Sequence, residues 1–347
     1  MNNEIVPVEL DYRDLVETYG SPLLVLDQAA VRKQYRALVK ALPGVRMHYA
    51  LKPLPHSAVV ATLKAEGCCF DLATNGEVDL MLENQINPDD CIHTHPIKRD
   101  GDISYALDYG CKVFVFDNPI ELEKFIPYQD KAQLLLRVSF PNPESKVDLS
   151  KKFGCTPEAT LPLLRKAKEL GLNVIGLSFH VGSQVPNSRR HVEAITACNQ
   201  LIRDAAAENI NLQVLDIGGG FPVNYGADGA DLDIYEFCAP IRGALSNTPE
   251  GIHLLAEPGR FISAPCMTSV SSVMGKAERF GRMWYYLDDG LYGSYSGQLF
   301  DHINYPKSAP YATGEALPAV LAGPTCDSID VLADDIDLPA LNVGDVI

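Results

Sequence analysis

The sequence lacks several features that mark membrane, secreted and nucleic-acid-binding proteins. No apolar run is long enough to span a bilayer, and the first fifteen residues, "MNNEIVPVELDYRDL", are acidic and lack the apolar region of a signal peptide. Positive charge is scarce, because 29 Lys and Arg stand against 45 Asp and Glu for a formal net charge of -16. This balance argues against nucleic acid or a membrane surface as a partner and suits small cationic ligands.

A disulfide framework and a metal site are also not indicated. The nine cysteines are an odd number without framework spacing, and Cys69, Cys91 and Cys111 adjoin apolar runs as reduced core residues do. A cytoplasmic protein is therefore expected. The "HTH" at 93–95 has no partner at zinc-like spacing, so no metal is expected.

The apolar pattern predicts an α/β protein. Between about residues 45 and 260, short apolar segments alternate with amphipathic ones that often close on glycine. Strands that alternate with helices pair in parallel, and eight such units predict a (β/α)8 TIM-like barrel. The eight predicted strands are 47–51, 68–72, 90–93, 112–116, 133–138, 173–179, 212–217 and 252–256.

The two ends of the chain predict a second domain. "SPLLVLD" reads as a strand outside the alternation, and after about residue 265 the chain becomes rich in turns and strands. We therefore expect a barrel over 28–265 and a mostly antiparallel β domain from 1–27 plus 266–347. The ending "LNVGDVI" is strand-like and would leave a sheet edge unless further strands or a partner cover it.

One lysine and several charged residues follow the predicted strands. Lys52 comes directly after an apolar run and before a proline, so it is either a solvated lysine or an amine held for imine chemistry with a carbonyl compound. Asp71, Glu77 and Arg137 occupy or follow other strand ends, where ordinary salt bridges are the alternative. Active sites of such barrels lie at these ends.

The last three predicted barrel strands end in residues that suit a phosphorylated aromatic ligand. "GGG" at 218–220 and Arg260 would hold an anion, although an ordinary turn is the alternative. Glu257 ends an apolar run and needs a cation, either Arg260 or a protonated pyridine nitrogen. His180 is either a core histidine or a ring that stacks on the ligand. Together with Lys52 these groups describe a pyridoxal 5'-phosphate (PLP) site.

The motifs in which these residues stand resemble a known family. They are "YALKP", "FDLATNGEV", "FHVGSQ", "LDIGGGFP", "AEPGRF", "LDDGLYGSYSGQLFDH" and "GPTCDSID". From about residue 20 to the end, the sequence is similar to the fold type III PLP-dependent decarboxylases, in the ornithine decarboxylase branch. The resemblance implies an alanine racemase-like fold, in which a PLP-binding barrel is joined to a β domain.

The resemblance also implies roles for individual residues. Lys52 matches the lysine that binds the cofactor covalently, Glu257 the carboxylate on its ring nitrogen, and His180 the stacking histidine. Cys326 matches a cysteine that controls reprotonation of the product. Further matches are cofactor-binding residues: Asp71, Glu77, Arg137, Ser183, Gly218, Gly219, Gly220, Gly259, Arg260 and Tyr292.

The same resemblance implies a homodimer with shared active sites. Cys326 is then supplied by the second subunit, and Lys152 and Asp330 pair across the interface. Asp301 and Asp327 match the two aspartates that meet the distal ammonium of ornithine. The expected reaction converts L-ornithine to putrescine and CO2, a step of polyamine biosynthesis.

Alternative activities are open at this point. Lysine is one methylene longer, worth roughly 1–3 kcal/mol in a pocket, so dual specificity stays open. Diaminopimelate decarboxylases typically carry "CES" where this chain has Cys326 and Asp327. A racemase would lack "CDSID" and "FDH", and a catalytically silent regulator would have lost Lys52 or Cys326. The family's cofactor-contacting tyrosine in a "GAYT"-like segment has no match up to Ile347.

Overall fold

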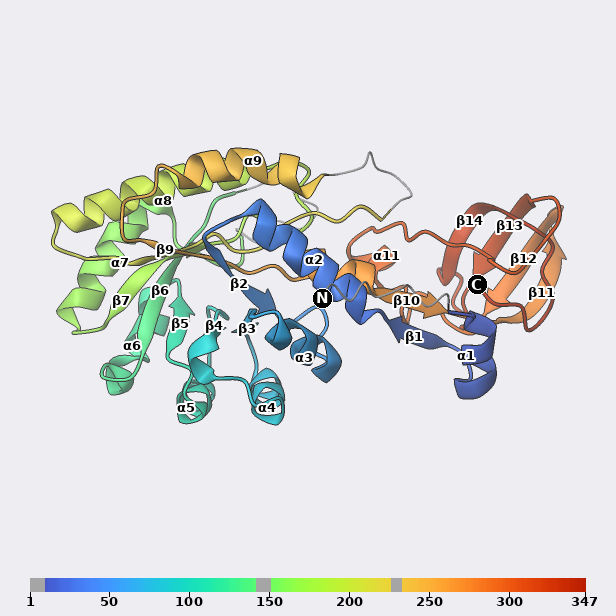
Figure 1. Ribbon diagram of the computed structural model, residues 1–347, viewed down its shortest axis with the longest axis horizontal. Coiled ribbons are helices and arrows are strands. Elements are labelled where there is room, and N and C mark those ends of the chain that lie inside the picture. The colour runs from blue at the N-terminus through green and yellow to red at the C-terminus, as the bar shows by residue number, and fades with distance from the viewer. Residues whose placement is uncertain (1–9, 142–150, 226–232) are drawn as a thin grey trace, which may run out of the picture. The chain divides into compact units, whose positions relative to one another are not determined.

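The computed structural model describes residues 10–141, 151–225 and 233–347, which fall into two compact units (Figure 1). The larger lies within Asp27–Asn224 and Ala230–Cys266, and the smaller within Met1–Leu26, Tyr225–Gly229 and Met267–Ile347. None of the helices in the described ranges has the length and apolar character that crossing a membrane requires.

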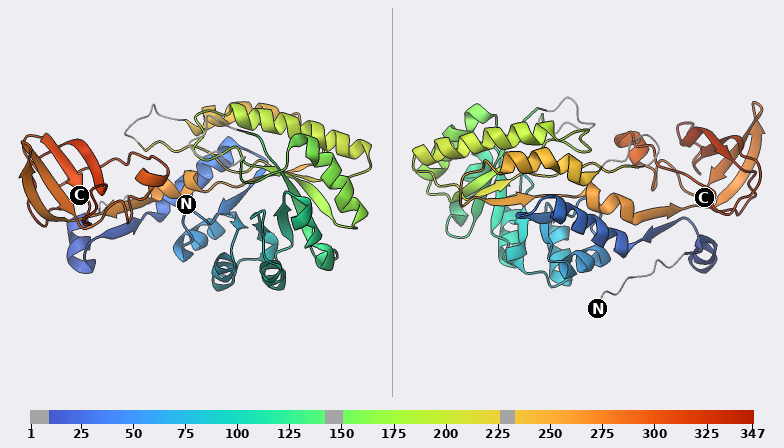
Figure 2. Two further views of the ribbon diagram at one scale, coloured as in Figure 1. Left: turned by 180° about the vertical axis from the view of Figure 1, so that it is seen from behind. Right: turned by 45° about the horizontal axis from the view of Figure 1, so that its top comes forward.

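The larger unit is a closed barrel of eight parallel strands in chain order. The strands are β2 Val45–Ala50, β3 Cys69–Leu72, β4 Cys91–His93, β5 Val113–Phe116, β6 Gln133–Val138, β7 Val174–Phe179, β8 Val214–Asp216 and β9 His253–Ala256. The α-helices are α2 Gln28–Ala41, α3 Ser57–Ala65, α4 Asn75–Glu83, α5 Asp100–Tyr109, α6 Pro119–Glu123, α7 Pro157–Glu169, α8 Arg189–Ala207, α9 Ile234–Leu245 and α10 Arg260–Ser263. Single 3-10 turns are η1 Pro88–Asp90, η2 Ile126–Tyr128 and η3 Ala264–Cys266. The longer helices lie outside the strands (Figures 1 and 2), which confirms the predicted barrel.

The barrel interior is apolar in the middle and charged at one end. Val115, Leu135, Val214 and Leu255 form a buried cluster contributed by four different strands. Since side chains alternate along a strand, the residues two positions further on face the same way. The residues that follow Leu135, Val214 and Leu255 in this way are Arg137, Asp216 and Glu257. The apolar cluster therefore lies beneath a layer of charged side chains.

The smaller unit is built from strands of both chain regions. Its elements are α1 Tyr12–Tyr19, β1 Leu23–Leu26, β10 Met267–Val270, β11 Val273–Arg279, β12 Arg282–Leu287, α11 Gly297–Phe300, β13 Leu317–Ala322 and β14 Val331–Leu338. β1 pairs antiparallel with β10, and the other four strands form a sheet in the order β11-β12-β13-β14. Only the β12–β13 pair of this sheet is parallel, because the long connection between these strands, which includes α11, lets the chain cross over. The prediction of a mostly antiparallel second domain is confirmed.

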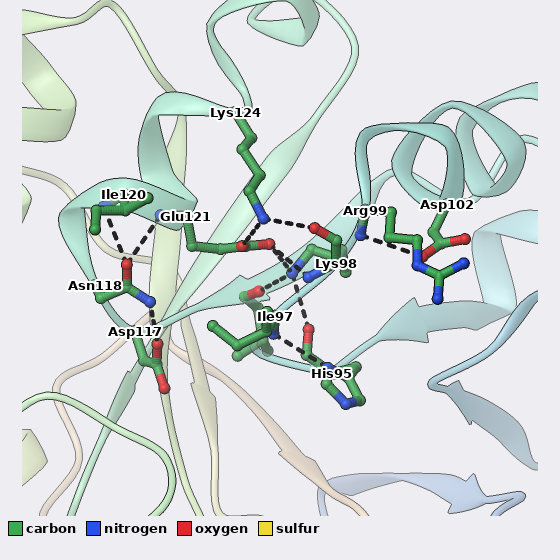
Figure 3. A network of polar contacts seen from close by, with 11 residues as sticks. His95, Ile97, Lys98, Arg99, Asp102, Asp117, Asn118, Ile120, Glu121 and Lys124 are labelled. Atoms are coloured by element: carbon green, nitrogen blue, oxygen red, sulfur yellow. Dashed lines mark hydrogen bonds and ion pairs between the residues drawn. The ribbon is translucent and has the colours of Figure 1, made fainter.

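A buried ion pair joins the loop after β4 to helix α6 (Figure 3). The Lys98 ammonium, 1% exposed, lies 3.1 Å from the Glu121 carboxylate and donates to the carbonyl oxygens of His95 at 2.8 Å and Val115 at 2.6 Å. Glu121 also accepts from the ammonium of Lys124 at 2.6 Å. Burial lowers the pKa of Lys98 to about 8, and the charge of Glu121 opposes this shift. The network fixes the loop after β4 to the end of β5.

Removing one partner of this pair should destabilise the larger unit. Glu121→Ala leaves the Lys98 ammonium buried without its counter-charge, so we expect the free energy of unfolding to fall by about 3–5 kcal/mol. Chemical denaturation measures the loss. The matched control is Glu123→Ala in the same helix, since Glu123 is 53% exposed and pairs with Lys166 at the surface. The control should cost less than about 1 kcal/mol, and equal losses in the two variants would contradict the assigned role.

Candidate active site

The predicted barrel residues lie at one end of the barrel. Lys52 follows β2 by two residues, Glu257 follows β9 directly, and Arg137 lies near the end of β6. The carboxyl ends of parallel strands meet at the same rim, so the fold brings these groups together. The same rim carries Asp71, Glu77, His180, Ser183, Gly218, Gly219, Gly220, Gly259 and Arg260.

The centre of this rim holds an excess of carboxyl groups. Asp71 is 9% exposed and accepts from the Thr94 hydroxyl at 2.5 Å. Asp216 is fully buried, and its Oδ1 accepts from the Gly218 amide at 2.9 Å. Within the part of the chain that the structure describes, Asp216 Oδ2 has no hydrogen-bond partner. Glu257 interacts with both aspartates, and Arg137 brings positive charge to all three acids.

Burial and mutual repulsion make these acids hard to ionise. Burial raises the pKa of Asp71 to about 8, a shift that the Thr94 hydrogen bond opposes and the charge of Asp216 reinforces. Glu257 keeps some exposed surface, yet desolvation by the surrounding protein raises its pKa well above the usual range, and the charges of Asp216 and Asp71 add to this. Desolvation lowers the pKa of Arg137, against the pull of Glu257. A further cation among these groups would be strongly stabilised.

Three glycines next to the acids form a narrow backbone cradle. Gly218 has φ +65°, and a Cβ there would lie 2.2 Å from Phe179 O. Gly220 has φ +91°, and a Cβ there would lie 2.4 Å from Gly182 O. A Cβ on Gly219 would lie 2.5 Å from Glu257 O. Only glycine therefore fits this turn, which leaves the backbone open to close approach by a ligand.

The positive charge beside this cradle comes from Arg260. Its guanidinium Nε donates to the Ser183 hydroxyl at 3.2 Å, so two of the predicted anion-binding side chains are in direct contact. A Cβ on Gly259 would lie 2.9 Å from the Pro53 ring. The proline after Lys52 therefore packs against the residue before Arg260, which couples the lysine loop to the predicted anion site.

The ring of His180 is neutral and fixed in orientation. The Gly182 amide donates to His180 Nδ1 at 3.0 Å, which assigns the proton of the neutral ring to Nε2. Desolvation lowers the pKa of His180 well below its usual value, and the charges of Arg137 and Lys52 act in the same direction. A flat ring without charge suits stacking on an aromatic ligand.

Lys52 and Glu77 differ in exposure, because Lys52 lies at the surface and Glu77 is buried and hydrogen-bonded. Burial raises the pKa of both Asp71 and Glu77, and the charge of Lys52 opposes this shift. Glu77 is 7% exposed and forms a capping box, because its carboxylate accepts from the Ala73 amide at 2.6 Å and the Thr74 amide at 3.0 Å. Glu77 thus has a structural role at the start of α4 that the sequence interpretation did not include.

The remaining predicted residues, apart from Lys152, belong to the smaller unit. Tyr292 donates from its hydroxyl to Asp327 Oδ2 at 2.5 Å, and Asp301 directly follows α11 as its C-cap residue. Cys326 is exposed, whereas the other eight cysteines are buried. Asp330 is 2% exposed and makes its hydrogen bonds within its own chain. In the larger unit, the Lys152 ammonium lies 5.0 Å from the centre of the Phe153 ring.

Two residues of the rim were missed by sequence reasoning. Asp216 follows an apolar run in "VLDIGGGFP", which is the same signal that singled out Glu257. His191 is fully buried in α8, its Nε2 lies 3.0 Å from the Gly219 carbonyl oxygen, and its ring stacks on Phe221. Nothing in the local sequence marks His191, because its partners lie about 30 residues away in the chain.

Fold and site together define a class of protein: a barrel enzyme that binds a phosphorylated, cationic aromatic cofactor. The glycine cradle beside Arg260 fits a phosphate, and the excess of buried carboxyl groups fits a protonated ring nitrogen. Residues 28–264 match the model of "pyridoxal-dependent decarboxylase, pyridoxal binding domain", and the chain belongs to this family of PLP-dependent decarboxylases, which makes it an enzyme.

Individual relatives place the chain near decarboxylases of basic amino acids. It is 33% identical to the lysine/ornithine decarboxylase of Selenomonas ruminantium over 97% of this chain and 85% of that protein. It is also 33% identical to the antizyme inhibitor 2 of Xenopus laevis, over 92% of this chain and 74% of that protein. A crystal structure of lysine/ornithine decarboxylase from Vibrio vulnificus, complexed with putrescine, shares 55% identity and a TM-score of 0.91 over 96% of this chain and 89% of that chain.

The raised pKa of Asp71 predicts a pH dependence of stability for the cofactor-free protein. The folded chain keeps a proton on Asp71 up to a pKa of about 8, whereas the unfolded chain releases it near the usual pKa of 3.8. The free energy of unfolding should therefore fall as the pH rises from 4 to 8, by at most about 1.4 kcal/mol per pH unit from this group, and level off above pH 8.

Denaturation of the wild type and of Asp71→Asn at several pH values isolates this contribution. The difference in free energy between the two proteins should change between pH 4 and 8, since Asn does not titrate. A difference that is independent of pH would show that Asp71 is ionised in the folded protein.

Proposed function

We propose that this enzyme removes the α-carboxyl group, as CO2, from a basic L-amino acid, with ornithine as the first candidate substrate and lysine as the second. The observation that carries the proposal is the group of buried acids beside the glycine cradle, because it fits a protonated pyridine ring with a phosphate. The names of the relatives that act on ornithine and lysine support the substrate class. The products would be putrescine and cadaverine.

The residues of the larger unit would hold the cofactor. Lys52 would bind it covalently, Glu257 would hold the proton on its ring nitrogen, and His180 would stack on its ring. The phosphate would lie against Gly218–Gly220 with Ser183 and Arg260, and Gly259 leaves space beside them. Once bound, the cofactor supplies an electron-poor ring that accepts the electron pair released with CO2.

Neighbouring groups hold Glu257 in place and set the charge around it. The Glu257 amide donates to the Gly218 carbonyl at 2.8 Å, so the acid and the cradle share one backbone contact. The charge of Arg137 favours the ionised form of Glu257, and Asp71 and Asp216 make the same region more negative. A proton on the ring nitrogen is then stabilised by Coulomb attraction to these acids.

Recognition of the distal amine would come from the smaller unit. Asp327 and Asp301 carry the negative charge that a distal ammonium needs. The hydroxyl of Tyr292 holds one oxygen of Asp327, and both side chains are exposed. A carboxylate at position 327 favours a substrate that ends in an amine alone, which ornithine and lysine both do.

We further propose a homodimer with shared active sites. Cys326 and Asp327 lie on an exposed loop, as residues offered to a second subunit would. Lys152 and Asp330 are the proposed interface pair, although the buried carboxylate of Asp330 already has partners in its own chain. A cytoplasmic location stays a prediction.

Replacement of Lys52 should abolish the activity. In Lys52→Ala the cofactor has no amine to bond with, so we expect both its lysine-bound absorption band and CO2 release from ornithine to disappear. Absorption spectra and CO2 release from ornithine, lysine, diaminopimelate and arginine measure the two effects and rank the substrates. The control is Lys33→Ala on the exposed face of α2, which should keep both signals. Persistent CO2 release in Lys52→Ala would refute the assigned role.

Mixing two inactive variants should restore activity if the sites are shared. Lys52→Ala and Cys326→Ala damage the larger and the smaller unit respectively. In a mixed dimer one of the two sites has both residues intact, so random mixing should recover up to about a quarter of the wild-type activity. The measurement is CO2 release after the two proteins are unfolded, mixed and refolded together. No recovery in mixed dimers confirmed by mass would count against shared sites.

A further inference from the structure

Each carbonyl group of the glycine cradle Gly218–Gly220 accepts a hydrogen bond from outside the cradle. The amide of Glu257 donates to the first carbonyl at 2.8 Å, and the amide of Val185 donates to the third at 3.3 Å. The second carbonyl accepts from Nε2 of the His191 ring at 3.0 Å. His191 is therefore the only one of these three donors that is a side chain, and the only one that a substitution can remove.

The peptide group between Gly219 and Gly220 needs such a contact to fix its orientation. Glycine adopts positive and negative φ about equally well, so a peptide group between two glycines can turn over at little cost. Its carbonyl oxygen and its N–H point in opposite directions, because the peptide is planar and trans. The Gly219 carbonyl faces His191, so the N–H of Gly220 points away from it. Among the described residues the amides of Gly219 and Gly220 have no acceptor, and amides in such turns bind anions.

The surroundings of the His191 ring would suit an apolar side chain better. The ring stacks on Phe221 with the centroids 5.5 Å apart, and it meets Phe237 edge to face with the centroids 6.0 Å apart. Because a carbonyl oxygen can only accept, the proton of the neutral ring is on Nε2. Nδ1 then has no hydrogen-bond partner within the described part of the chain, which is costly for a buried polar atom. Packing alone does not explain a histidine here, whereas its hydrogen bond to the cradle does.

The His191 ring is uncharged at neutral pH. Burial lowers the pKa of His191 to about 4, and the hydrogen bond to Gly219 opposes this shift. The ring therefore does not attract an anion by charge, as the guanidinium of Arg260 would. Any contribution of His191 to anion binding must come through the peptide group that it contacts.

From these contacts we propose that His191 is a positioning residue for the cofactor phosphate: it holds the Gly219 carbonyl on the side of α8 and so leaves the Gly220 amide available to a phosphate oxygen. This inference rests on the proposed function, which places the phosphate at the cradle. A donor that is fixed before the ligand arrives binds it more tightly, because less conformational freedom is lost on binding. If the peptide turned over, the Gly219 carbonyl oxygen would take the place of this donor and repel the phosphate.

The test compares His191→Asn with His191→Gln, two amides of which only the longer can place its nitrogen where Nε2 of histidine lies. Protein freed of cofactor is titrated with PLP and with pyridoxal, which lacks the phosphate, and absorption spectra give both dissociation constants. In His191→Asn we expect PLP to bind about 10- to 100-fold more weakly and pyridoxal less than about 3-fold more weakly. His191→Gln should bind both within about 3-fold of the wild type. An equal loss of PLP affinity in the two variants would reject the role of the hydrogen bond.

Phe237→Leu is the control for a general disturbance of the ring cluster. Phe237 contacts the rings of both His191 and Phe221, so the substitution opens a cavity beside them and leaves the Nε2 donor in the chain. We expect the melting temperature to fall, while the preference for PLP over pyridoxal stays at its wild-type value. If this preference falls as far in Phe237→Leu as in His191→Asn, packing rather than the hydrogen bond supports the cradle, and the proposal is wrong.

Arg260→Met separates this inference from the proposed place of the phosphate. The variant removes the positive charge beside the cradle, so the preference for PLP over pyridoxal should fall if the phosphate lies there. If it falls in Arg260→Met but not in His191→Asn, the place of the phosphate is supported and the role of His191 is refuted. If it falls in neither, the phosphate lies elsewhere and both proposals fail. Because no substrate is needed, the binding constants decide the role of His191 even if the wild type releases no CO2.

Discussion

The crowding of carboxyl groups at the carboxyl ends of the barrel strands is the constraint on which the site depends. Taking a carboxylate out of water is costly unless a cation or several donors face it. Asp71, Asp216 and Glu257 are gathered around the guanidinium of Arg137, and burial raises the pKa of each acid. The fold maintains this unfavourable arrangement although the described residues bring fewer cations than acids to it. A protonated ring nitrogen would relieve it, because its positive charge would offset the desolvation and mutual repulsion of the acids. The electrostatics of the protein site and the charge of the cofactor ring are therefore complementary.

The barrel creates this arrangement through the alternation of side chains along its strands. Leu135, Val214 and Leu255 fill the middle of the barrel, and the residues two positions on bring charge to its end. Two further steps along the chain from Asp216 lead to Gly218, the first glycine of the proposed phosphate site. The apolar cluster beneath excludes water from one side of the acids, which strengthens their interactions with anything bound above them. The same strands thus contribute both to the stability of the fold and to the proposed affinity for the cofactor.

The sequence predicts the barrel and its rim well, because both depend on local patterns. The predicted strand 133–138 coincides with β6, and the other seven predictions differ from the observed strands by a few residues at most. Contacts between segments that are far apart in the sequence are harder to predict from it. The capping box of Glu77 forms only when the backbone of α4 is in place. The contact of His191 with Gly219 depends on how α8 packs, which the local sequence does not show. The roles of Glu77 and Asp330 were interpreted by resemblance alone, and in both cases the structure adds hydrogen bonds that motif matching does not show.

Buried aspartates in this chain serve two different purposes, and their hydrogen-bond donors distinguish them. Asp289 and Asp330 are surrounded by neutral amide and hydroxyl donors, and glycines leave room for their oxygens. Asp216 is equally buried, but among the described residues one of its oxygens has no donor. A satisfied carboxylate stabilises a turn, because its charge is spread over several N–H groups. A carboxylate with an oxygen that accepts no hydrogen bond is still available to interact with a bound ligand. For this reason we assign Asp216 to the charged group at the barrel end, although the sequence analysis did not select it.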